Sequence, residues 1–171
     1  RSASLYQWLD RAGGFDTSDY CVPKEVLFPE RVEDLTYVKV RFALAERKLT
    51  AIHSVFLHRA VSVLDYIRAH WELLLRDMAA GTVDESVPLS APWRKKLRSW
   101  LPPDPRRAAE LRALQADVQP EDMVRRIWPG IQYILGIGGE NFPIYTRAME
   151  RYAPSVPIHH FIYGASEGFL S

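Results

Sequence analysis

The stretch that decides the fold is Ile158-His-His-Phe-Ile-Tyr-Gly-Ala-Ser-Glu-Gly168, in which an apolar, strand-like pattern leads directly into a turn of small residues. The turn carries the ring of Tyr163, the hydroxyl of Ser166 and the carboxylate of Glu167. Open α/β sheets bind ligands just outside the carboxyl ends of their strands. A ring for stacking, an oxygen for a phosphate and an anion for a metal at that place indicate a nucleotide site. The same residue types would also fit a purely structural alternative, in which a glycine-containing turn ends a buried strand and binds nothing.

A second strand end of similar design precedes it. The β-rich run Ile131–Asn141 ends at Gly138 and Gly139, which would let the backbone approach a flat ligand, although an ordinary strand-to-helix turn would also explain them. Between the two strands, helical spacing relates Ile144, Ala148, Met149 and Tyr152, and Pro143 suits a first helical turn. The order strand, helix, strand predicts that both strand ends face one edge of a parallel sheet.

The upstream sequence extends this pattern. We predict a helix over 35–48 with Asp34 as its cap, a buried strand over 49–56 and one long helix over 57–80 that ends at Gly81. Residues 82–129 are rich in proline and predict a helical insertion, whereas residues 1–33 predict an irregular connecting segment. The predicted fold class is therefore α/β: a parallel sheet flanked by helices, with a helical insertion, in a unit spanning residues 34–171.

Composition excludes several classes of function. Lys+Arg 22 against Asp+Glu 21 gives a net charge of +1, so no basic field indicates nucleic acid as a partner. No apolar run approaches the roughly 20 residues of a membrane span. The lone Cys21 favours a reducing compartment, and we expect the cytoplasm. His159 and His160 are adjacent on a predicted strand, so their rings would point to opposite faces and could not jointly bind a metal.

Three ordered motifs resemble one known family. They are Ser54-Val-Phe-Leu57 followed by a helix with Trp71-Glu-Leu, Arg126-Ile-Trp-Pro-Gly130, and Tyr163-Gly-Ala-Ser-Glu-Gly168. From Asp34 to Ser171 the chain resembles the auxin-responsive-promoter family of acyl acid amido synthetases, within the adenylate-forming superfamily of firefly luciferase and the acyl-CoA ligases. Gly164 stands where plant members usually have alanine, so the resemblance does not imply a plant hormone substrate.

The resemblance implies a two-step reaction that uses ATP and Mg²⁺. A carboxylic acid is adenylated, and its acyl group then passes to an amine such as an amino acid, forming an amide. It implies Glu167 as metal ligand and catalytic residue, and Ser166 as the catalytic partner of the α-phosphate. The implied nucleotide-binding residues are Tyr163, which would stack on adenine or ribose, and Gly164, Ala165, Gly138, Gly139 and Glu140. A looser implication places Phe56, Leu57 and His58 in the pocket for the acyl acid.

Both ends of the chain look like cuts through a larger protein, because Arg1 is not a methionine and the chain stops shortly after Glu167. We expect part of the large N-terminal domain of an adenylate-forming enzyme, inactive alone, whose partners include the phosphate loop and C-terminal domain of its own longer chain. Two alternatives stay open. An acyl-CoA ligase would share the adenylation step, and a degenerate domain would bind nucleotide or act as a scaffold without turnover.

Overall fold

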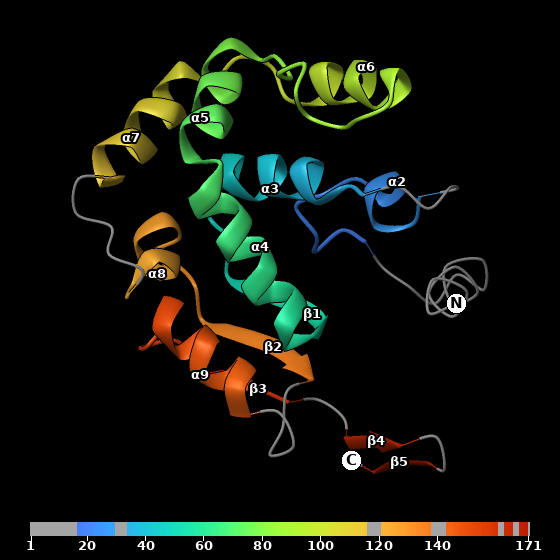
Figure 1. Cartoon of the computed structure of the whole chain (residues 1–171), viewed down its shortest axis with the longest axis vertical. Coiled ribbons are helices and arrows are strands. Elements are labelled where there is room, and N and C mark those ends of the chain that lie inside the picture. The colour runs from blue at the N-terminus through green and yellow to red at the C-terminus, as the bar shows by residue number, and fades with distance from the viewer. Residues whose placement is uncertain are drawn as a thin grey trace.

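The computed structural model describes residues 17–29, 34–115, 121–137, 143–160, 163–165 and 168–170. Within these ranges it forms a parallel sheet, helices that cover one face of that sheet, and a separate helical layer (Figure 1). No helix in the described ranges is long and apolar enough to cross a membrane.

The sheet has the strand order β1-β2-β3, with β1 at Ala51–Phe56, β2 at Tyr133–Ile137 and β3 at Ile158–His159. Both pairings are parallel; Ala51 lies opposite Tyr133, and Ile134 lies opposite Ile158. Parallel neighbours require a crossover, and helix α9 (Pro143–Tyr152) supplies the one between β2 and β3. The predicted parallel sheet flanked by helices is thus confirmed, and its strands end at one edge.

Helices α4 (Leu57–Ala69) and α9 cover one face of the sheet. The facing positions Leu57, Ile134 and Met149 are fully buried. A polar contact also joins the two helices, because the Tyr152 hydroxyl donates to Asp65 and accepts a 3.3 Å hydrogen bond from Arg68. The helix that follows β1 and the helix that follows β2 therefore form one layer.

The long helix predicted over 57–80 is interrupted. It divides at His70 into α4 and α5 (Trp71–Ala80), and the backbone of His70 has φ −115° and ψ 22°. The two parts pack on different partners, since α4 lies against β1 and α9 whereas α5 lies against α7 (Pro105–Gln115). Tertiary packing explains the break, because one straight helix could not cover the sheet and the helical layer together. Gly81 ends α5 in the left-handed conformation, as predicted.

The remaining helices are α2 (Lys24–Leu27), α3 (Thr36–Ala45), α6 (Ala91–Trp100) and α8 (Met123–Ile127). Helices α6, α7 and α8 all fall in the region expected to be an insertion, and α7 begins at Pro105, a residue suited to a first turn. Buried Arg107 joins this region to α3, donating to the carbonyl oxygens of Leu44 at 2.9 Å and Ile127 at 3.1 Å. Trp128 adds a 2.8 Å bond from its indole N–H to the carbonyl of Ala43.

Two local predictions are wrong. The strand over 49–56 was expected to be buried, but β1 lies at one side of the described sheet, and His53, Val55 and Phe56 are exposed. The segment expected to be a turn after the last strand contains a strand of its own. Tyr163–Ala165 forms β4, which pairs antiparallel with β5 (Gly168–Leu170) in a second, two-stranded sheet. Strand pairing with partners three to seven residues away therefore overrides the small-residue signal that suggested a turn.

Candidate functional site

Apolar side chains gather at the edge where β1 and β2 end. The large hydrophobic residues that are exposed in the described part of the chain are Val55 (38%), Phe56 (47%), Ile144 (69%) and Tyr145 (37%). The first two end β1 and the last two begin α9. We call these four residues and His58 the rim. Exposed apolar groups of this size near one edge of the described sheet make that edge a candidate binding surface.

Three rings of the rim form a continuous stack. The His58 imidazole lies over the Phe56 ring, with centroids 5.6 Å apart and planes at 23°. On α9, the ring of Tyr145 lies 5.4 Å from the same imidazole at 45°. Residues nearly ninety positions apart are thus held in contact by the pairing of their elements. The stack presents flat apolar surface beside an imidazole whose nitrogens lie in the ring plane.

The chain holds Phe56 outward by passing from strand to helix without a loop. Phe56 is the last residue of β1, and the next residue, Leu57, begins α4 and is fully buried. The hydroxyl of Ser54 donates a 2.8 Å bond to the carbonyl of Phe56, and the β1–β2 register shifts between His53 and Phe56. Leu57 therefore supports the rim from beneath, in the core, while Phe56 and His58 form its surface.

Gly136 allows this close packing. A Cβ at Gly136 would lie 3.2 Å from the carbonyl oxygen of Ser54 and 3.5 Å from the Cα of Leu57. Its own carbonyl accepts a 2.8 Å hydrogen bond from Nδ1 of His160, just after β3. The neighbouring His159 ring instead lies 5.9 Å from the ring of Tyr133 at 67°. The two adjacent histidines thus have separate partners, and His160 joins the ends of β2 and β3.

Several predicted site residues lie outside the described residues. These are Gly138, Gly139 and Glu140, which follow β2 in the sequence, together with Ser166 and Glu167. Tyr163, Gly164 and Ala165 are described as backbone only, in strand β4. Within the described ranges, no group of three or more His, Cys, Asp or Glu side chains could hold a metal ion. Of the predicted site, the structure therefore brings together Phe56 and His58, with Leu57 beneath them.

Sequence reasoning missed the two residues that α9 contributes. Helical spacing grouped Ile144 with Ala148, Met149 and Tyr152 as an apolar face, yet Ile144 is exposed whereas Met149 and Tyr152 are buried. Tyr145 was given no role, although it lies in the first turn of a helix that follows a strand end. That position was the available signal, because the first turn after a parallel strand faces the ligand edge of the sheet.

A parallel sheet flanked by helices, with an exposed aromatic rim where its first strand ends, places this chain in the α/β class, whose members bind ligands at that edge of the sheet. Comparison with known families identifies it further. Residues 7–158 match the GH3 family N-terminal domain, and the chain belongs to this family.

Named relatives are similar along most of the chain. Jasmonoyl–L-amino acid synthetase GH3.3 of Oryza sativa subsp. japonica is 28% identical over 156 residues, which cover 90% of this chain and 34% of that protein. The probable indole-3-acetic acid-amido synthetase GH3.13 of the same organism is 26% identical over 148 residues, or 85% of this chain and 31% of that protein. The chain thus spans about a third of the length of these relatives.

Solved structures support the fold. The GH3.15 acyl acid amido synthetase aligns with a TM-score of 0.76 and 20% identity, covering 86% of this chain and 27% of that one. A second structure, AtGH3.15 acyl acid amido synthetase in complex with 2,4-DB, aligns with a TM-score of 0.71 and 17% identity over 95% of this chain and 28% of that one. The described architecture therefore matches part of an amido synthetase.

Proposed function

We propose that this chain forms the acid-binding part of an ATP-dependent acyl acid amido synthetase. In the first step a carboxylate oxygen attacks the α-phosphorus of ATP and pyrophosphate leaves. In the second, an amine nitrogen attacks the acyl carbonyl, AMP leaves with the bonding electron pair, and the nitrogen loses a proton. Membership of the GH3 family and relatives named as amido synthetases support this reaction.

The observation that carries the proposal is the rim, where exposed Phe56 and Tyr145 flank His58. Aromatic and aliphatic groups that face solvent lower their free energy when a ligand covers them. A carboxylic acid with a flat or branched apolar body would cover this surface. Offset stacking against the rings would favour an aryl body, at about 0.5 to 1.5 kcal/mol per ring pair beyond the area buried.

His58 is the polar member of the rim, and we assign it to the carboxylate of the acid. Its imidazole has two ring neighbours, Phe56 and Tyr145, and its nitrogens, which lie in the ring plane, are the groups that can hydrogen-bond a ligand. An N–H in that plane would hydrogen-bond a carboxylate oxygen and orient the acid, while the rings bind its body. His58 would thus orient the acid for its attack on the phosphorus of ATP and would take no part in making or breaking bonds.

The nucleotide would bind next to the rim along the same edge of the sheet. We keep Tyr163 as the ring that stacks on adenine or ribose, and Ser166 and Glu167 as the catalytic pair. Gly138, Gly139, Glu140, Gly164 and Ala165 complete the proposed nucleotide wall. When bound, Mg²⁺ would neutralise phosphate charge, with Glu167 as its ligand.

Partners follow from the reaction. They are a small carboxylic acid, an amine such as an amino acid, and the remaining two-thirds of a protein as long as the named relatives, which would supply the phosphate loop and C-terminal domain. The single cysteine, Cys21, has its pKa raised by burial and would remain a thiol, in keeping with a cytoplasmic location.

Isotope exchange tests the proposal in the protein encoded by the complete gene. A panel of aryl and alkyl carboxylic acids is screened for acid-dependent exchange of pyrophosphate into ATP, and products made with a mixture of amino acids are identified by mass. Exchange with aryl acids and amide products are expected. A thioester formed only with free CoA would establish the ligase alternative, and an absence of exchange with every acid would support a non-catalytic domain.

A further inference from the structure

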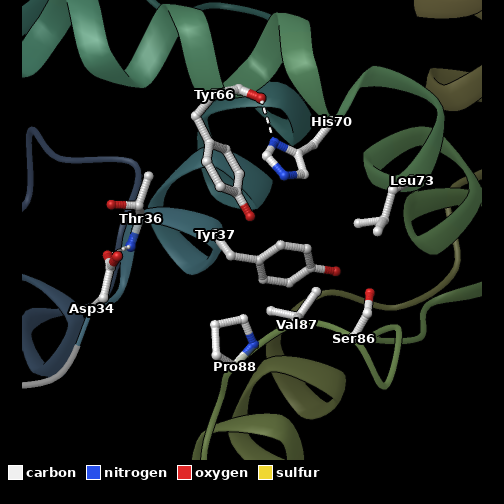
Figure 2. A pocket seen from close by; sticks show the side chains of 9 residues that line it. All are labelled: Asp34, Thr36, Tyr37, Tyr66, His70, Leu73, Ser86, Val87 and Pro88. Carbon is white, nitrogen blue, oxygen red and sulfur yellow. Dashed lines mark hydrogen bonds between the residues drawn. The ribbon is translucent and has the colours of Figure 1, made fainter.

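A separate pocket lies in the helical layer, between α3, the junction of α4 and α5, and the segment before α6 (Figure 2). Its volume is about 250 Å³. Ligand sites for drug-sized molecules usually measure roughly 300 to 1,000 Å³, so this pocket suits a compound with one ring and a short chain. None of its lining residues belongs to the rim. They are Asp34, Thr36, Tyr37, Tyr66, His70, Leu73, Ser86, Val87 and Pro88.

The floor of the pocket is apolar because the polar atom of Tyr37 is already used. The Tyr37 hydroxyl donates a 2.7 Å bond to Asp77 and accepts one of 2.7 Å from Arg41, both behind the pocket. Tyr37 therefore offers its ring to a ligand. Val87 and Leu73 also line the pocket and add aliphatic surface.

One wall consists of Tyr66 and His70. Their rings are stacked with centroids 4.1 Å apart and planes at 21°. The Nδ1–H of His70 donates a 3.1 Å bond to the carbonyl oxygen of Tyr66, which fixes the orientation of the imidazole. The Tyr66 hydroxyl points toward the ring of Tyr37 in Figure 2. A flat ligand would thus meet aromatic surface on the floor and on this wall.

The charge of the lining selects the ligand. Asp34 is its one carboxylate, and no lysine or arginine is among the described lining residues. Hydrogen bonds from Thr36 hold the pKa of Asp34 below its ordinary value, so Asp34 is an anion at neutral pH. Lys39 and Arg59 act on Asp34 from outside the lining and do not enter it. Asp34 is therefore the one charged group among the described lining residues, and an ammonium group in the pocket would meet its carboxylate.

We propose that this pocket binds a small aryl-alkyl ammonium compound, with the ammonium group at Asp34 and the aryl ring against Tyr37 and Tyr66. The aromatic faces also favour a cation through their quadrupoles. The ligand of this pocket would thus be positively charged, whereas the acid proposed for the rim is negatively charged. The inference rests on the lining alone and does not depend on the proposed function.

Tyramine is a suitable probe, and 3-(4-hydroxyphenyl)propionate is its matched control because it replaces the ammonium with a carboxylate on the same ring. Each is titrated into the protein while the methyl resonances of Leu73 and Val87 are followed by NMR. We expect saturable shifts of both resonances with tyramine and none with the propionate. Equal shifts with both compounds, or no saturation by tyramine up to about 10 mM, would overturn the proposal.

Two variants locate the charge. Asp34→Asn keeps an oxygen that can accept the 2.9 Å bond from the Thr36 N–H and removes only the charge. It should weaken tyramine binding about tenfold, the lower end of the range for a hydrogen bond to a charged group. Glu150→Gln, which makes the same change in net charge on exposed α9, should leave the affinity unchanged. Equal affinities for Asp34→Asn and the parent protein would refute the role of Asp34.

Discussion

The rim and the buried polar cluster formed by Tyr37, Arg41 and Asp77 depart from the usual distribution of side chains in opposite ways. The rim exposes apolar groups, and the cluster buries charged ones. At the rim, Phe56, Ile144 and Tyr145 expose apolar surface. In the cluster, Arg41 and Asp77 are 2% and 1% exposed. A soluble domain ordinarily does neither without a reason.

The partners of each group show why the two regions differ. Arg41 donates to the Tyr37 hydroxyl at 2.7 Å and to the carbonyls of Thr82 at 2.9 Å and Asp77 at 3.1 Å. The Asp77 carboxylate accepts from Tyr37 at 2.7 Å and from the N–H of Asp84 at 2.8 Å. Most polar atoms of the cluster thus find partners within it, Arg41 Nε being left without one, and the cluster joins α3 to α5, whereas the rim leaves apolar surface exposed in the described part of the chain. The first is a structural device, and the second is the surface that we propose binds the acid.

Removing the Asp77 carboxylate should have the largest effect on stability. Asp77→Ala leaves the Tyr37 hydroxyl and the Asp84 N–H without their acceptor and the Arg41 charge buried alone. We expect a loss of about 3 to 5 kcal/mol in the free energy of unfolding, measured by urea denaturation. A loss below 1 kcal/mol would mean that water or another group replaces the carboxylate, and that the cluster does not hold the helices together.

Two isoleucines provide a matched pair for the comparison. Ile67 on α4 is fully buried, and Ile144 at the rim is 69% exposed. Ile67→Ala should lower the free energy of unfolding by about 2 to 5 kcal/mol, since it opens a cavity. Ile144→Ala should change it by less than about 0.5 kcal/mol. Similar losses in both variants would show that the rim belongs to the core and is not free to bind a ligand.

Gly81 should give an intermediate effect. Its φ is +66°, and a Cβ there would lie 2.7 Å from Cδ of Pro103. Gly81→Ala should therefore cost about 2 kcal/mol, from the left-handed backbone and from crowding against the proline ring. Gly130→Ala is the control, because a Cβ at Gly130 would lie 3.8 Å from its nearest neighbour, the carbonyl oxygen of Leu49. Comparing the thermal unfolding of the two variants separates the effect at Gly81 from a general effect of losing a glycine.

The smallest effect concerns pH. Hydrogen bonds with Thr36 are the main cause of the lowered folded-state pKa of Asp34. The ionised carboxylate therefore adds to the free energy of unfolding at pH values above its unfolded pKa of about 3.9, and this contribution is lost as the pH falls through the folded-state pKa. The stability difference between the parent protein and Asp34→Asn should therefore shrink as the pH is lowered from 7 to 2. A difference that stays constant over this range would contradict the assignment.

Much of the fold could be predicted from the sequence because its signals are local. The periodicity of α4 and α5, the glycine after α5 and the β-rich runs of β1 and β2 all depend on near neighbours in the chain. The break at His70 could not be predicted, since it follows from the different packing partners of the two halves. Strand β4 was missed for a related reason, because its pairing with β5 outweighs the turn preference of Gly164 and Ala165.

The candidate site was predicted only in part. Phe56 and His58 were identified through a resemblance, at the junction of a strand and a helix. Tyr145 was not, because its contact with His58 joins elements separated by the whole helical layer. The position of Tyr145 in the first helical turn after a strand could have placed it at the ligand edge, but its contact with His58 depends on the parallel pairing of β1 with β2.

Kinetics of the Tyr145→Ala variant test the central claim most directly. In pyrophosphate exchange by the protein from the complete gene, KM is measured separately for the acid and for ATP, with Trp93→Ala in α6 as a control that removes an aromatic ring outside the rim. Loss of a ring at the acid site should raise KM for the acid about tenfold, as expected for roughly 1.4 kcal/mol of binding free energy, and leave KM for ATP unchanged. An unchanged KM for the acid in Tyr145→Ala would contradict the assignment of the rim as the acid-binding surface.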